Sequence, residues 1–145
     1  SDLAATLTLR GGILDGSGAI AGSINNVSAT INPTGTVQIS GNYAQGAAAT
    51  LQIDLGPGGA DAIQAGLGQF VNPSSIGGTL AVILASGFTP DPDAGYRIFS
   101  SGSSTFNATF ATVTGGLPIF YKPAAILLNA ENERQYLAYL ALVGK

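Results

Sequence analysis

The 38 residues from 16 to 53 contain no charged side chain, and this constrains the fold more than any other feature of the chain. Aliphatic residues alternate with small polar residues within this stretch, as at 37–39 and 51–53. Alternation with a period of two is typical of a β-strand that buries one face. Asn, Pro and Gly residues at 32–35 and 41–42 favour turns between such segments. The stretch therefore predicts short strands joined by tight turns.

The outward-facing residues of these strands are mostly Thr, Ser, Asn, Gln and Ala. A sheet with one face in water normally carries several charges on that face, and here there are none. Small uncharged side chains suit a β-solenoid, in which each coil stacks on the next and similar side chains form ladders. We therefore expect an all-β fold of the solenoid class, a parallel β-helix. An antiparallel β-sandwich is the alternative.

The chain has 145 residues, which is the size of a single domain. We expect solenoid coils over 1–121 and a C-terminal cap or partner-exchange segment over 122–145. Within that segment, the apolar runs 125–128 and 136–143 predict a capping strand pair. A helix over 131–143 is the alternative, because short apolar runs fit both structures.

Two segments in the middle of the chain stand out. Residues 66–75 lack the alternating pattern and are interpreted as an excursion from the core. Residues 80–84 are all apolar, which predicts a strand that is buried on both faces.

The composition excludes several classes of function. The chain has no Cys and no His, so it offers no disulfide, thiolate nucleophile, zinc site of the usual kind or Ser-His-Asp triad. Five basic and eight acidic residues give a net charge of −3, which argues against binding to nucleic acid. No apolar run of 18 residues occurs, so we expect no insertion into a membrane through a helix. The sequence opens at Ser1 without the pattern of a signal peptide.

Two pairs of carboxylates are the candidates for acid–base chemistry on a sugar, Asp54 with Asp61 and Asp91 with Asp93. Only Arg10 and Arg97 could support them, and these lie far apart in the sequence. We interpret Asp61, Asp91 and Asp93 as turn residues instead. Asp61 also follows a glycine pair as in a calcium-binding repeat, but a single copy lacks the six or more oxygen ligands that calcium takes. We expect no catalytic residues, no cofactor and no metal.

Residues 16–21 fit the loose glycine pattern of a dinucleotide-binding loop. That pattern requires a helix after the loop and an acidic residue about 20 positions later. Neither is present, so we interpret these residues as a turn between strands.

Several short phrases follow one another in a recognisable order. They are the segments 41–45, 49–55, 61–63, 77–80, 87–90, 95–99 and 106–110. Their order resembles the C-terminal passenger segment of bacterial autotransporters and related surface adhesins, and residues 7–18 look like the repeat turns that precede it. The resemblance covers roughly residues 5–113.

The resemblance implies a right-handed parallel β-helix that is exported and displayed outside the cell. Most members of that family are adhesive or structural scaffolds. This chain departs from the pattern in having no outer-membrane translocator barrel, in the excursion around 69–75 and in its tail from Lys122 onward.

The ends of a solenoid expose unpaired strand edges, which proteins normally block with charges, bulges or a cap. The first half of the chain offers only Asp2, Arg10 and Asp15 for this purpose. An uncapped N-terminal coil would invite another subunit, and a head-to-tail contact that does not close gives a filament. The apolar tail could complete the sheet of a neighbour by strand addition.

We therefore expect a non-catalytic, extracellular structural or adhesive subunit that assembles end to end into a fibre, sheath or surface array. The alternative is a carbohydrate-binding or polysaccharide-acting domain of a cell-envelope or phage protein, with a surface glycan as partner. The residues that we expect to contact a partner are aromatic or apolar side chains in the excursion and the tail: Phe70, Val71, Phe120, Tyr121, Tyr136 and Tyr139.

Overall fold

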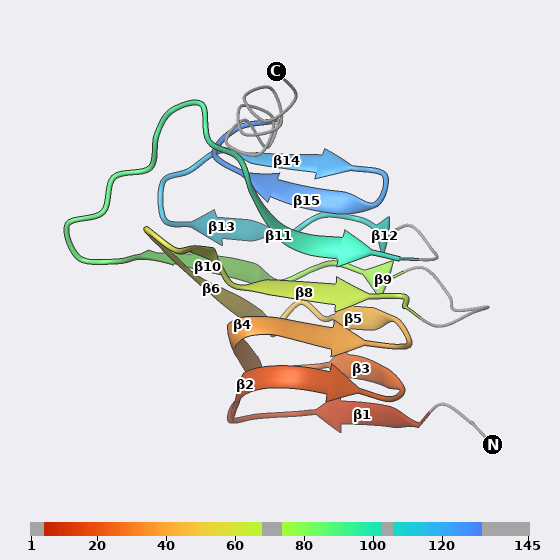
Figure 1. Ribbon diagram of the computed structural model, residues 1–145. Coiled ribbons are helices and arrows are strands. Elements are labelled where there is room, and N and C mark those ends of the chain that lie inside the picture. The colour runs from red at the N-terminus through yellow and green to blue at the C-terminus, as the bar shows by residue number, and fades with distance from the viewer. Residues whose placement is uncertain (1–4, 68–73, 103–105, 132–145) are drawn as a thin grey trace.

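The computed structural model describes residues 5–67, 74–102 and 106–131. This part of the chain contains fifteen strands in two sheets, and no helix occurs in it (Figure 1). The expectation of an all-β protein is confirmed. Within the same residues, no helix is long and apolar enough to cross a membrane.

One sheet has five short strands, and all its neighbouring strands run parallel. In spatial order these strands are β1 (Thr6–Leu9), β3 (Ser23–Asn26), β5 (Tyr43–Gln45), β9 (Ser74–Ser75) and β12 (Phe106–Asn107). The spatial order is also the sequence order, because the chain visits the other sheet between one strand and the next.

The second sheet has ten strands and is mixed. Its strands are β2 (Ile13–Ile20), β4 (Thr30–Ile39), β6 (Thr50–Gly56), β7 (Gly59–Ala60), β8 (Ala62–Ala65), β10 (Thr79–Leu84), β11 (Tyr96–Ser101), β13 (Thr112–Thr114), β14 (Ile119–Lys122) and β15 (Ala125–Leu128). Three pairs are antiparallel, namely β6 with β7, β11 with β15 and β14 with β15, and the other pairs are parallel.

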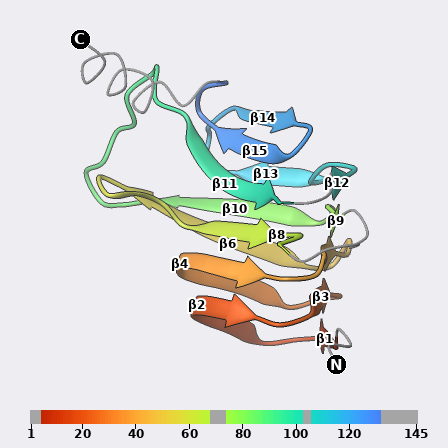
Figure 2. The same ribbon diagram turned by 45° about the vertical axis from the view of Figure 1, so that its right-hand side comes forward.

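The ten-stranded sheet bends around a corner and divides into two arms. The long strands β2 and β4 continue through the corner, and their register shifts between Gly16 and Gly18. Beyond β4, the first arm consists of β6, β10 and β13, and the second consists of β8, β11, β15 and β14. In Figure 2 the corner lies on the left and the five-stranded sheet lies on the right, so the two arms and the five-stranded sheet surround a common interior.

The core consists of aliphatic and aromatic columns that run through successive strands. In the first arm, residues in register form the column Leu14, Ile31, Leu51, Leu80 and Val113. In the second arm they form the column Val37, Ile63, Phe99, Ile126 and Tyr121. Full burial of such a side chain stabilises the fold by about 1.5–3 kcal/mol. The alternation seen in the sequence therefore supplies the inward face of every layer.

Tight stacking at one turn requires glycine. The N–H of Gly41 donates to the carbonyl of Gly22 at 2.7 Å. A Cβ at Gly41 would lie only 2.1 Å from Ser23 Oγ and 2.7 Å from the Gly22 carbonyl oxygen. Successive layers can approach this closely only where no side chain stands between them.

The antiparallel sandwich, our alternative from the sequence, is wrong for most of the described chain. Strands that follow one another through the stack pair in parallel, and Thr30 is in register with Thr50 and Thr50 with Thr79. Parallel partners need a long crossover, which the chain provides by passing through the other sheet.

The predicted pairing of 125–128 with 136–143 is also wrong. β15 has β14 on one edge and β11 on the other, so both of its edges are occupied. The hairpin forms one strand earlier because β14 and β15 are joined by only two residues, and such short connections favour local pairing. Residues 136–143, and the alternative helix from residue 132 onward, lie outside the described residues.

The prediction that residues 80–84 are buried on both faces is wrong as well. Burial alternates along β10, with Leu80 and Val82 buried and Ile83 47% exposed. The inner face of β10 meets the core, whereas no described layer covers its outer face, so an all-apolar run gives a half-buried strand here.

Candidate functional site

The N-terminal end of the stack has two open strand edges. Among the described residues, β1 pairs only with β3, and β2 pairs only with β4. The other edge of each strand presents unpaired backbone N–H and C=O groups, which form a template for a further strand. Figure 1 shows β1 and β2 together at the lower end of the molecule.

The side chains at this end are apolar and only partly covered. Ile13 is 72% exposed and Leu7 is 41% exposed. Beside β2 lies a hollow of about 160 Å³, whose lining includes Leu14, Ile20 and the core residue Ile31. The interior columns of the fold therefore stop at this end without a covering layer.

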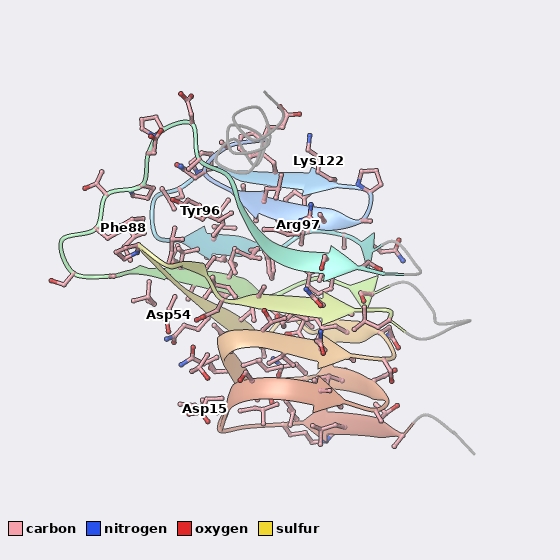
Figure 3. All side chains as sticks on the ribbon, viewed as in Figure 1. Asp15, Asp54, Phe88, Tyr96, Arg97 and Lys122 are labelled. Atoms are coloured by element: carbon pink, nitrogen blue, oxygen red, sulfur yellow. The ribbon has the colours of Figure 1, made fainter. Side chains whose placement is uncertain are left out.

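Few charged side chains lie near these edges to oppose pairing with another chain. Arg10 and Asp15 are the charged residues of the described N-terminal coil, and both are exposed. Asp15 projects from the lower end of the stack in Figure 3. Open edges normally carry lysines, inward-pointing charges or bulges that prevent pairing with another chain. From residue 5 to residue 26 the described chain has one positive and one negative side chain, Arg10 and Asp15.

The opposite end is built differently, although among the described residues β12, β13 and β14 also pair on one edge only. Its last two layers are the antiparallel strands β15 and β14. Tyr121 on β14 accepts a hydrogen bond from the Phe110 N–H at 3.1 Å, and burial raises the pKa of its phenol. Lys122 forms an ion pair with Glu131 at 2.6 Å, and its hydrogen bond lowers the pKa of that carboxyl. Lys122 lies at this end in Figure 3.

An asparagine fastens a long loop to the same end. Asn129 has a φ of 78°, and its Nδ2 donates to the carbonyls of Asp91 and Ala94, both at 2.7 Å. The loop that precedes β11 is thereby held against the residue that follows β15.

The six predicted contact residues do not mark the open end. Phe120 and Tyr121 are half-buried on β14, in the hairpin at the opposite end. Phe70, Val71, Tyr136 and Tyr139 lie outside the described residues. Sequence reasoning identified the shortage of charges at the N-terminal end but missed Leu7 and Ile13, because nothing in the local sequence separates an edge aliphatic from a core one.

The carboxylates bind backbone groups. Asp61 accepts hydrogen bonds from the Gly35 N–H in β4 at 2.9 Å and from the Asp54 N–H in β6 at 3.2 Å, so it joins two strands. Asp91 accepts one from the Asp93 N–H at 2.8 Å, and its predicted turn role is confirmed. Within the described ranges, no group of three His, Cys, Asp or Glu side chains could hold a metal ion.

The glycine pattern at 16–21 lies within β2 and forms the corner of the sheet. Gly16 and Gly18 have φ values of 108° and 134°, which few other residues adopt. The segment that follows is β3, so the helix that a dinucleotide-binding loop requires does not follow it. The interpretation as a turn between strands is wrong for residues 16–20, which bend within one strand.

A buried polar cluster joins β5 to the segment that runs from β9 to the start of β10. Tyr43 donates its hydroxyl proton to Gln45 Oε1, and Gln45 Nε2 donates to the carbonyls of Gly77 and Thr79 at 2.7 and 3.0 Å. The Tyr43 N–H donates to Ser74 Oγ at 3.0 Å. Burial raises the pKa of the Tyr43 hydroxyl above its ordinary value. These side chains satisfy one another, so we assign the cluster a structural role.

Comparison with known proteins identifies no relative of this chain. No family model, curated protein or solved structure matches the chain. The autotransporter-like resemblance therefore stays a proposal.

Proposed function

We propose that this chain is a right-handed parallel β-helix with an antiparallel cap at its C-terminal end, and that it acts as a non-catalytic structural or adhesive module outside the cell. The parallel registers within both sheets support the β-helix. A connection between parallel strands of one sheet is right-handed in about 98% of cases, which supports the handedness. The phrases that resemble adhesin passenger segments support export.

The module acts by pairing the open strand edges at its N-terminal end with strands of a partner. The observation that carries this proposal is the open edge of β2, on which Ile13 is 72% exposed. Burial of that edge would satisfy its free backbone groups and remove apolar surface from water at about 25 cal/mol per Å². Self-association through this end joins copies of the module.

A matched pair of substitutions tests the proposal. Ile13 and Ile83 are both exposed isoleucines on β-strands, but β2 has one open edge whereas β10 is paired with β6 and β13. We expect Ile13→Lys to weaken self-association at least tenfold in sedimentation velocity, because lysine on an edge opposes strand addition. Ile83→Lys should leave it unchanged. Equal effects of the two substitutions would refute the proposal.

A glycan-binding role is the second candidate, and one observation favours it. Thr30, Thr50, Thr79 and Thr112 are in register on the outer face of the first arm. Their hydroxyls would repeat at the strand spacing of about 4.8 Å, which offers a regular surface to a repeating polymer. A glycan array tests this, with Thr50→Val as the variant and Thr89→Val as the loop control. Binding that survives Thr50→Val would exclude this wall as the site.

A further inference from the structure

We propose that the partner of the N-terminal end is a second copy of this chain, bound end to end across a two-fold axis through Ser17 to form a closed dimer. This inference rests on the self-association proposed above and specifies its partner and register. Four independent features of the N-terminal coil support it, namely its backbone direction, its side-chain pattern, its shape and its charge.

The backbone of β2 presents alternate residues to the open edge. The carbonyls of Gly12 and Ile20 accept hydrogen bonds from Thr30 and Ser40 of the next layer, both at 3.0 Å. Residues of one parity therefore face β4, and residues of the other parity face outward because successive residues of a strand alternate in direction. The N–H and C=O groups of Ile13, Asp15 and Ala19 thus point to the open edge, and Ser17 lies at the register shift between the two arms. A second strand can bond to these N–H and C=O groups.

The side chains of β2 fix the register of an antiparallel partner. Leu14 and Ile20 are in register with the buried residues Ile31 and Ile39, so both belong to the inward face. Centring the pairing on Ser17 places Leu14 of one copy opposite Ile20 of the other. A shift of one residue would place inward side chains against outward ones.

The shape of the coil has the same symmetry. β2 bends between Gly16 and Gly18, and Ser17 lies at the corner between its two arms. A two-fold axis through the corner exchanges the two arms. In Figure 2 the five-stranded sheet lies across from the corner, so the same axis brings β1 of one copy to β1 of the other. Both open edges are therefore covered in one contact.

The charges at this end tolerate such a contact. Pairing centred on Ser17 places Asp15 opposite Ala19 of the second copy, so the two carboxylates do not face each other. At the other end, β14 and β15 extend the second arm by two strands beyond β11, whereas the first arm ends at β13. That end is uneven, so the N-terminal ends match each other better than they match the C-terminal end. A contact between identical surfaces closes at two copies.

The chain contains no cysteine, which permits a clean cross-linking test. Residues that face each other in a hydrogen-bonded antiparallel pair have Cα atoms about 5.5 Å apart, and a disulfide spans about 4.4–6.8 Å. We expect oxidised Ser17→Cys to form a covalent dimer in high yield. Ser86→Cys, in the exposed loop after β10, controls for random collision and should stay mostly monomeric.

The register has its own test, which does not depend on the folding of one variant. Asp15→Cys and Ala19→Cys should each cross-link poorly alone, but a mixture of the two should give a heterodimeric disulfide. If wild-type protein forms open-ended oligomers and these disulfides do not form, the two-fold pairing is wrong while the proposed self-association stands. If wild-type protein is monomeric at every concentration tested, both are wrong.

Discussion

The two ends of this molecule are built from the same kinds of residue but finish differently. At the N-terminal end, β1 and β2 are parallel to the layers above them and leave open edges. At the C-terminal end, the chain reverses after β14, and β15 lies antiparallel between β11 and β14. The difference teaches that the last strands of an end can come from a local hairpin or from crossovers through the other sheet. A two-residue turn is enough for the hairpin, whereas parallel neighbours need the longer connection.

The largest expected effect comes from shortening a core leucine, either in the middle of one column or at its N-terminal end. Leu51 and Leu14 belong to the same column, but Leu51 is fully buried in the middle and Leu14 is half-buried at the open end. We expect Leu51→Ala to lower the free energy of unfolding by about 2–5 kcal/mol. Leu14→Ala should cost much less in dilute protein, as measured by urea unfolding. Equal losses would mean that the N-terminal end is covered in the monomer.

A smaller loss of stability is expected at the C-terminal end. Asn129→Ala removes two hydrogen bonds to the loop and places alanine at a φ of 78°. Asn129→Gly removes the same bonds without the backbone strain. We expect thermal unfolding to show both variants destabilised, with alanine worse by about 1–2 kcal/mol. Alanine and glycine variants of equal stability would contradict the assigned role of the backbone.

The smallest effect should come from the ion pair at that end. Lys122 and Glu131 are exposed or nearly so, and exposed pairs contribute about 0–1 kcal/mol. We expect Lys122→Ala to leave the stability almost unchanged and to return the pKa of Glu131 toward its ordinary value, as followed by NMR titration. A large loss of stability would contradict the small contribution assigned to this ion pair.

Much of the local structure could be predicted from the sequence. The alternation at 51–53 correctly predicted a strand, and Asp91 was recognised as a turn residue, whereas the turn predicted at 32–35 is wrong because these residues lie within β4. The features predicted correctly depend on residues close together in the chain, so the local sequence is enough to predict them.

The pairing of distant segments could not be predicted in the same way. Ile83 belongs to an all-apolar run, yet it faces outward because no layer covers its arm. Ile13 is in register with Thr30, and only the absence of a described strand on its other side makes it an edge residue. Exposure at such positions depends on which strand lies beside them, and a local pattern carries no information about that neighbour.

Amide hydrogen exchange, followed by NMR at several protein concentrations, tests the central claim most directly. The account predicts that the amides of Ile13, Asp15 and Ala19 exchange rapidly in dilute protein and gain protection as the concentration rises, while the amides of β14 do not change. Protection that rises with concentration at β14 and stays constant at β2 would contradict the account.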